Sequence, residues 1–309
     1  MNYLGELISI GVAFSWTATA LLSEMGSKRM GNLTLNFTRM AIALIFSAIL
    51  FWAITGNPLP AKASNEAYLW MMLSGLVGYV IGDFCLFQCY IIIGSKFGQL
   101  FMTLAPITAA VMAWATLGQK IGPMALVAMA VTLTGIAITV LGKSEDNHRL
   151  SLKLPLNGVL FAIGAAVCQG MGLVLSKIGM NHYEASLEAP CEPWILPFYA
   201  NVFRCLAGIV GFSVLLMFRE GFSSLRKNIT DRTSMTVATL TTIFGPFVGV
   251  GCSLLAVQYT SAGVASTLMA LTPIIIILPA WWLFKQPITT KSVMGAIISV
   301  IGVSLFFLF

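Results

Sequence analysis

Charged side chains are scarce in this sequence. Of its 309 residues, 17 are Lys or Arg and 11 are Asp or Glu, together 9% of the chain, whereas 58% are hydrophobic. A soluble domain carries about 25% charged residues, so these few charges do not cover a water-soluble surface. The composition excludes a cytosolic enzyme, a secreted disulfide scaffold and a disordered protein, and leaves an integral membrane protein surrounded by lipid tails.

Histidine and cysteine are absent from the places where a metal or redox site needs them. Both histidines, His148 and His182, lie in polar loops, so no apolar run carries a histidine for a proton relay. Cys85 and Cys89 have i,i+4 spacing, but no histidine or second cysteine pair accompanies them. We therefore interpret the cysteines as packing residues and expect neither a metal site nor a cofactor.

Enzyme signatures are missing as well. The sequence has no Gly-x-Ser-x-Gly, no phosphate-binding loop, no Asp-rich prenyltransferase pair and no intramembrane His–Glu zinc motif. Without a phosphate-binding loop, this chain alone does not carry out ATP-driven transport. We expect a protein that is not an enzyme.

Long apolar runs are what the sequence has instead. A membrane span needs about 20 apolar residues. The runs predict helices, because they lack the period-2 alternation of barrel strands, which need only about 10 residues. The ten predicted spans are 4–23, 33–54, 68–92, 95–117, 122–142, 156–180, 195–217, 234–257, 260–284 and 290–309. The predicted fold class is an all-α integral membrane protein with ten transmembrane helices.

The two halves of the sequence align with each other. A register that carries Arg, Pro, Gln and Gly together is not expected by chance in apolar sequence. The matched pairs are Gly5 with Gly158, Trp16 with Gln169, Ser23 with Ser176, Asn36 with Asn201, Arg39 with Arg204, Gly82 with Gly249, Met102 with Met269, Pro106 with Pro273, Gln119 with Gln286 and Gly135 with Gly302. This alignment predicts two repeats, 1–142 and 154–309, joined by a cytoplasmic linker at 143–153.

Each predicted repeat has five helices, and this odd number has a topological consequence. The second repeat enters the membrane from the opposite side, so the two repeats are inverted. Inverted repeats are a recurring architecture of secondary transporters, which bind substrate near the membrane midplane between the repeats. A duplicated scaffold that transports nothing is the alternative.

Several motifs carry a resemblance to a known family. They are Gly78-Tyr-Val-Ile-Gly82-Asp83, Leu104-Ala-Pro106 and Leu117-Gly-Gln-Lys-Ile, with counterparts in Gly245-Pro, Ser266-Thr-Leu-Met-Ala-Leu-Thr-Pro273 and Phe284-Lys-Gln-Pro-Ile-Thr. On these motifs the chain resembles EamA-type transporters of the drug/metabolite transporter superfamily over nearly its whole length. The resemblance implies a ten-helix basket whose first four helices per repeat line a central cavity. Gln119 and Gln286 stand where such repeats usually carry Glu.

The distribution of basic residues predicts the orientation. Loops after odd-numbered predicted helices hold Lys28, Arg29, Lys96, Lys143, Arg149, Lys153, Arg219, Arg226, Lys227, Arg232, Lys285 and Lys291, and the opposite side holds Lys62, Lys120 and Lys177. Because cytoplasmic loops are enriched in Lys and Arg, the first group is predicted to be cytoplasmic and both termini outside the cytoplasmic membrane. The net charge of +6 therefore indicates orientation, and no nucleic-acid partner is expected.

Three charged residues lie deep inside predicted spans, away from both ends of the span. They are Arg39, Asp83 and Arg204. A charge at the centre of a span costs about 2.5–3.5 kcal/mol on insertion scales, so such residues are expected to be paired or solvated. Arg39 and Asp83 are predicted to pair, either as a structural salt bridge or as a gate or proton-responsive carboxylate.

Arg204 has no equivalent acid, because Val250 occupies the position that matches Asp83. One interpretation is that Arg204 extends outward toward Glu188 or Glu192. The other is that it offers a fixed positive charge to an anionic or carboxylate-bearing substrate.

Further candidates are polar side chains on the predicted cavity faces and prolines that kink helices. Packing and back-bonding to the helix are the alternative roles for the hydroxyl residues. Tyr79, one turn before Asp83, is a candidate hydrogen-bond donor. The predicted substrate-binding or cavity residues are Trp16, Thr19, Arg39, Tyr79, Asp83, Gln99, Thr103, Gln169, Arg204 and Ser266, with helix kinks at Pro106 and Pro273.

These observations predict a secondary transporter, and specifically an exporter, of small polar or amphipathic metabolites that works by alternating access. A membrane enzyme acting on a lipid-borne substrate and a passive channel are the alternatives. The expected partners are a small-molecule substrate and the lipid bilayer. A proton is a possible coupling ion, and the chain is expected to be a monomer or a homodimer.

Overall fold

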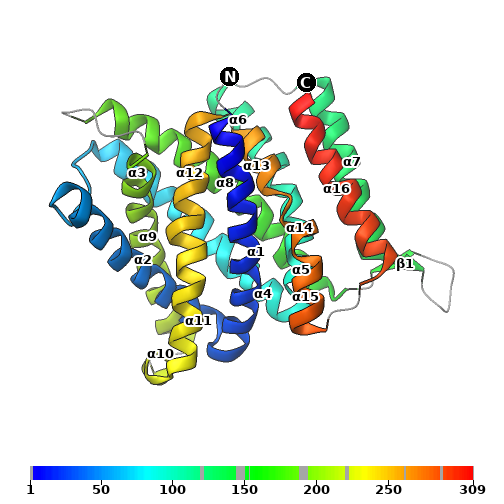
Figure 1. The fold of residues 1–309 in the computed structure, drawn as a ribbon, viewed down its shortest axis with the longest axis horizontal. Helices are drawn as coiled ribbons and strands as arrows, with labels where there is room; N and C mark the ends of the chain where they lie inside the picture. The colour runs from blue at the N-terminus through cyan, green and yellow to red at the C-terminus, as the bar shows by residue number, and fades with distance from the viewer. Residues whose placement is uncertain are drawn as a thin grey trace.

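The computed structural model describes residues 3–118, 122–143, 150–152, 154–187, 194–219, 223–260, 262–285 and 288–308. This part of the chain is almost wholly helical (Figure 1). The first half contains α1 Leu4–Met30, α2 Asn32–Thr55, α3 Asn65–Gly75, η1 Leu76–Asp83, α4 Phe84–Ile93, α5 Ser95–Phe101, η2 Met102–Leu104, α6 Ala105–Leu117, α7 Pro123–Val140 and strand β1 Leu141–Lys143.

The second half follows a similar order. It contains strand β2 Leu150–Leu152, α8 Leu156–Ala185, α9 Leu196–Arg219, α10 Ser223–Thr230, α11 Arg232–Thr242, η3 Ile243–Phe247, α12 Val248–Tyr259, α13 Ala262–Met269, α14 Thr272–Ile275, α15 Ile277–Phe284 and α16 Thr290–Leu308.

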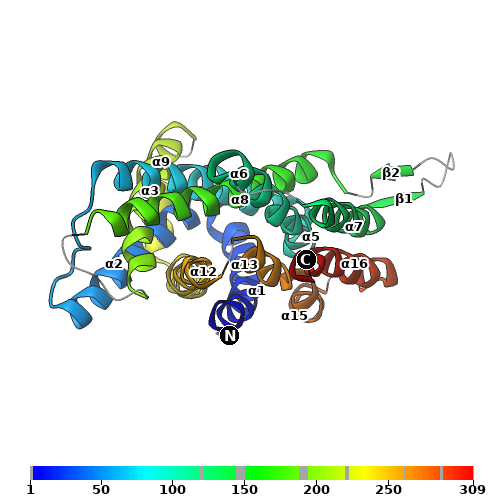
Figure 2. The same cartoon turned by 90° about the horizontal axis from the view of Figure 1, so that it is seen from above.

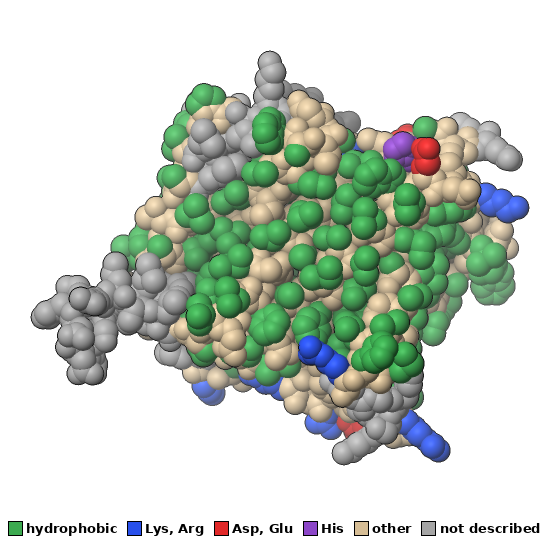
Figure 3. All heavy atoms as spheres, turned by 180° about the vertical axis from the view of Figure 1, so that it is seen from behind, with side chains coloured by type: hydrophobic (Ala, Val, Ile, Leu, Met, Phe, Trp, Pro, Cys, Tyr) green, Lys and Arg blue, Asp and Glu red, His purple; other side chains and the backbone are tan. Residues whose placement is uncertain are grey.

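Seven helices of the described chain are long and apolar enough to cross a membrane. They are Leu4–Met30, Asn32–Thr55, Asn65–Ile93, Ser95–Leu117, Leu156–Ala185, Leu196–Arg219 and Arg232–Tyr259. Hydrophobic side chains cover the middle of the face in Figure 3, and the charged side chains gather mainly toward its two ends. The prediction of a helical fold with many apolar spans is confirmed, and the count of ten spans stays a prediction.

Three local features differ from the prediction. Helix α1 continues to Met30, because the Lys28 ammonium pairs with the Glu24 carboxylate at 2.6 Å one turn earlier. The linker, predicted as a loop, begins and ends in a short antiparallel hairpin of β1 and β2, although 144–149 and 153 lie outside the described residues. The predicted loop before α11 contains the short helix α10.

Two of the spans leave α-helical winding at equivalent positions. The segments η1 and η3 are π-helical, and η3 contains Pro246 and a non-helical Gly245 with φ −92° and ψ −105°. A π-helical turn inside an α-helix is rare and occurs frequently at functional sites. Helices are also interrupted at the two matched prolines: η2 precedes Pro106, and a break between α13 and α14 precedes Pro273.

The first helix of each half packs into the other half. Helix α1 contacts α11, α12 and α13, whereas α8 contacts α3, α4 and α6, and α2 packs against α9. Helices α1 and α8 run in opposite directions, and α1 begins at the same end of the molecule where α16 ends (Figure 1). Figure 2 shows α7 and α16 side by side at one edge of the bundle.

The contact between α7 and α16 depends on two matched glycines. A Cβ on Gly135 would lie 2.5 Å from the Ser299 amide nitrogen, and a Cβ on Gly302 would lie 2.5 Å from the Thr132 amide nitrogen. The two backbones therefore approach as closely as small residues allow, which is a usual basis of helix association in membranes.

Gly135→Ala is expected to destabilise the protein by about 1–3 kcal/mol, the usual cost of overpacking, because the backbone of α16 would have to move. Gly11→Ala is the matched control, since a Cβ there meets nothing within 4 Å. Thermal unfolding in detergent should show a lower Tm for Gly135→Ala and no loss for Gly11→Ala. Equal Tm values for the two variants would contradict the close contact.

Candidate functional site

Three buried charged residues meet at the centre of the bundle. Arg39 lies on α2, Asp83 ends η1 and Arg204 lies on α9. They are 3%, 5% and 4% exposed, respectively. At this level of burial, charges must be compensated by partners and not by water.

Arg39 and Asp83 form an ion pair. The Arg39 Nη2 atom lies 3.4 Å from Asp83 Oδ2, and Arg39 Nη1 donates a hydrogen bond of 2.9 Å to Asn36 Oδ1. The guanidinium also stacks over the Phe87 ring, with Cζ 4.5 Å from the ring centroid. The arginine is thereby held by an acid, an amide and an aromatic face.

The second half supplies a further partner to Asp83. The Gln169 amide, on α8, donates 2.7 Å to Asp83 Oδ1 and 3.1 Å to the carbonyl of Gly78. Tyr79, the donor expected for Asp83, instead donates 2.7 Å to Asn201 Oδ1. The reason is that η1 is π-helical, so the α-helical spacing assumed for Tyr79 and Asp83 does not apply.

Arg204 is held differently from its counterpart. Its guanidinium lies over the Tyr79 ring, with Cζ 4.7 Å from the centroid. The buried Arg204 Nε has no hydrogen-bond partner among the described residues. The alternative partners Glu188 and Glu192 lie outside the described residues.

The two arginines nevertheless share one feature of their surroundings. A Cβ on Gly245 would lie 3.1 Å from Arg39 Nη2, and a Cβ on Gly78 would lie 2.9 Å from Arg204 Nη2. Gly245 and Gly78 are matched positions of η3 and η1. Each guanidinium therefore lies against a glycine in the π-helical segment of the other half.

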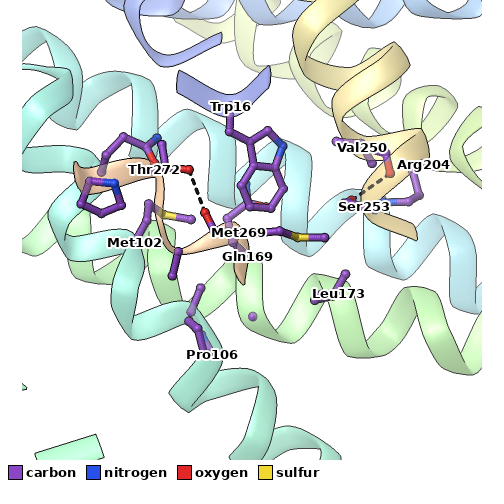
Figure 4. Close-up of a pocket in the computed structure, with 15 residues that line it drawn as sticks. Trp16, Met102, Pro106, Gln169, Leu173, Arg204, Val250, Ser253, Met269 and Thr272 are labelled. Carbon is purple, nitrogen blue, oxygen red and sulfur yellow. Dashed lines mark hydrogen bonds between the residues drawn. The ribbon is translucent and has the colours of Figure 1, made fainter. Parts of the chain in front are cut away.

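Two adjoining cavities lie beside these charges. The space that a water-sized molecule can occupy is about 50 Å³ in the first and about 70 Å³ in the second, so both cavities are narrow in this conformation. Residues shared by the two linings are Trp16, Gln99, Met102, Gln169 and Val250. Figure 4 shows the first cavity, with the Trp16 indole directed into it between Thr272 and Val250.

Comparison with known proteins identifies the family. A model of the EamA-like transporter family matches residues 3–141 and 156–308. The chain belongs to the EamA-like transporter family. This family is part of the drug/metabolite transporter superfamily, and its members are generally transporters and not enzymes. The chain is thus a multi-pass membrane protein, and the resemblance found in the sequence is confirmed.

Comparison with solved structures shows a similarity of fold only. No curated protein matches the chain. A solved structure titled "Crystal structure of protein" is 14% identical, with a TM-score of 0.65, and the match covers 100% of this chain and 98% of that chain.

The structure brings most of the predicted site residues of this EamA-like chain together. Residues that line one or both cavities are Trp16, Thr19, Arg39, Tyr79, Asp83, Gln99, Gln169, Arg204, Pro106 and Pro273. Thr103 does not line them: it is fully buried and its hydroxyl donates 2.7 Å to the carbonyl of Leu100. The side chain of Ser266 lies outside the described residues, as do Gln119 and Gln286.

Sequence reasoning missed several lining residues. Met102 and Met269 line the first cavity as a matched pair, and Tyr90 lines the second, where its hydroxyl accepts a hydrogen bond from Gln99. The matched methionines were visible in the repeat alignment. Nothing in an apolar run singled out Tyr90.

Polar contacts join the two halves at both ends of the molecule, an ion pair at one end and a histidine–carboxylate contact at the other. At one end Arg29 Nη2 lies 2.8 Å from Asp231 Oδ2, and at the other His182 Nδ1 lies 3.4 Å from Glu66 Oε2. Hydrogen bonds from Ser234 and from Arg29 lower the pKa of Asp231 to about 2. Asp231 therefore stays ionised at neutral pH, and its contribution to stability is lost only as the pH falls from about 4 toward that value.

Removal of one member of the buried pair is expected to destabilise the fold by about 3–5 kcal/mol, because the other charge is left uncompensated. Asp83→Ala should be more harmful than Arg39→Ala, since it leaves two buried arginines without an acid. The double variant should recover part of the loss.

Thermal unfolding in detergent checks this cycle, with exposed Lys62→Ala as the control. A double variant whose loss equals the sum of the two single losses would show that Arg39 and Asp83 do not interact energetically.

Proposed function

We propose that this protein is a secondary transporter of small polar or amphipathic metabolites, built from ten spans in two inverted repeats, 1–142 and 154–309. One observation carries the proposal. The first cavity is lined by matched positions of both halves: Trp16 with Gln169, Met102 with Met269, and Pro106 with Pro273. A site shared between inverted repeats is the arrangement from which secondary transporters derive alternating access.

The opposed directions of α1 and α8 support the inversion. In an inverted duplication, each half is able to adopt the conformation of the other half. Exchange of these conformations would move the opening of the shared cavity from one side of the membrane to the other. The Arg29–Asp231 ion pair and the His182–Glu66 contact, at opposite ends and both formed in this structure, would then break in turn.

The proposed orientation places both termini outside the cytoplasmic membrane, with export as the direction of transport. The support for this orientation is the excess of Lys and Arg in loops on the other side. In a variant without native cysteines, a cysteine at Asn57 should react with an impermeant thiol reagent from outside, and one at Arg226 only after the membrane is opened. The reverse pattern would invert the orientation and leave the transport proposal intact.

Flux measured in proteoliposomes with a metabolite panel tests the function. We expect saturable flux that is stimulated by substrate on the opposite side. Flux without saturation or countertransport would indicate a channel, and a chemically altered product would indicate an enzyme. No flux for any compound class would contradict the proposal.

Trp16→Ala should raise the half-saturating concentration about 10- to 150-fold, because loss of a buried aromatic contact costs about 1.5–3 kcal/mol. Trp52→Ala is the matched control, since Trp52 is 66% exposed on α2. Equal effects of the two substitutions on flux would show that substrate does not contact Trp16.

A further inference from the structure

The charges around the cavities do not balance. Among the described residues that line them, the charged ones are Arg39, Asp83 and Arg204. Arginine is always protonated in proteins, so this arrangement has two positive charges and one acid. An uncompensated charge in a low-dielectric interior is costly, and an ion of opposite charge that enters the site reduces this cost.

The surplus positive charge belongs to Arg204. Arg39 has the Asp83 carboxylate at 3.4 Å and the Asn36 oxygen at 2.9 Å. Arg204 has the Tyr79 ring against its guanidinium but no carboxylate partner among the described residues, and its buried Nε, like that of Arg39, has no hydrogen-bond partner there. Its side chain lines the first cavity, where the uncharged Val250 occupies the position matched to Asp83.

The remainder of the first cavity is mainly apolar. Trp16, Leu173, Met102 and Met269 contribute large apolar surfaces (Figure 4). Its hydroxyl groups are used locally: Ser253 donates 2.8 Å to the carbonyl of Val250, and Thr272 donates 2.7 Å to that of Met269. The cavity thus combines one cationic group with an apolar wall.

We propose that the substrate of this transporter is a monoanion, namely an ionised carboxylic acid with an apolar or aromatic body, whose carboxylate binds Arg204. The proposal rests on the proposed transport function and names its substrate class. The planar guanidinium fork fits a carboxylate in a bidentate geometry. One negative charge balances the surplus, whereas a dianion would exceed it and a cation would add to it.

A zwitterion fits less well. Its ammonium group would need a carboxylate, and Asp83 is already engaged by Arg39 and by the Gln169 amide. Binding of a zwitterion would also leave the surplus positive charge in place. The structure therefore favours an acid without an amino group.

Binding to the purified full-length protein in detergent tests the substrate class, by thermal shift and by tryptophan fluorescence at neutral pH. The probes are hexanoate, phenylacetate and indole-3-acetate, each beside its amide, together with phenethylamine and L-phenylalanine. We expect at least one acid to bind, and its amide, the amine and the amino acid to bind at least tenfold more weakly.

Arg204→Gln should weaken binding of that acid about 10- to 150-fold, because this is the loss of affinity expected when a hydrogen bond to a charged group is removed. Arg204→Lys, which keeps the charge and guards against a folding defect, should retain part of the affinity. Arg219→Gln is the control on the same helix, because Arg219 is exposed at the end of α9.

Failure of the inference is distinguishable from failure of the transport function. Binding of the amine or an amide as tightly as the acids, binding of no acid, or an unchanged affinity in Arg204→Gln would overturn the proposal. If proteoliposomes then carry out saturable flux of a neutral or cationic compound, the transport function stands without it. If the proteoliposomes transport no compound, both the substrate class and the transport function are wrong.

Discussion

The Asp83 carboxylate lies where the two halves of the chain meet, with Arg39 from the first half and Gln169 from the second half bonded to it. Because a buried charge must be compensated locally, this contact requires η1, α2 and α8 to pack closely. Arg204 approaches from α9, and its guanidinium lies over the Tyr79 ring and against Gly78, without a carboxylate partner among the described residues. The centre of the molecule is therefore held together by an acid that compensates one arginine and leaves the other available.

Matched glycines in the two halves make room for the close contacts between them. Gly78 and Gly245 admit the guanidinium groups, and Gly135 and Gly302 admit the opposing backbone where α7 crosses α16. Since each guanidinium lies against the π-helical segment of the other half, a movement of one half relative to the other changes the surroundings of both charges. Substrate binding and rearrangement of the halves would thus be coupled through the same contacts.

Much of the site could be predicted from the sequence, because charges in apolar runs must find partners and repeats must share an interface. The Arg39–Asp83 pair follows from the first rule, and the matching of Trp16 with Gln169 follows from the second. The bond from Gln169 to Asp83 could not be predicted, because it depends on how α8 packs against η1. Tyr79 was assigned the wrong partner because π-helical winding leaves no simple periodicity in the sequence.

Distances across the two ends of the protein test alternating access most directly. Spin labels at the matched, exposed pairs Lys28 with Arg232 and Asn65 with Asn181 report on the ends closed by Arg29–Asp231 and by His182–Glu66. The two distances should be anticorrelated in lipid bilayers: beside the state described above, in which both ends are closed, each population should have one pair separated and the other close, and added substrate should shift the balance between populations. A population with both ends separated, or distances that do not respond to any transported compound, would contradict it.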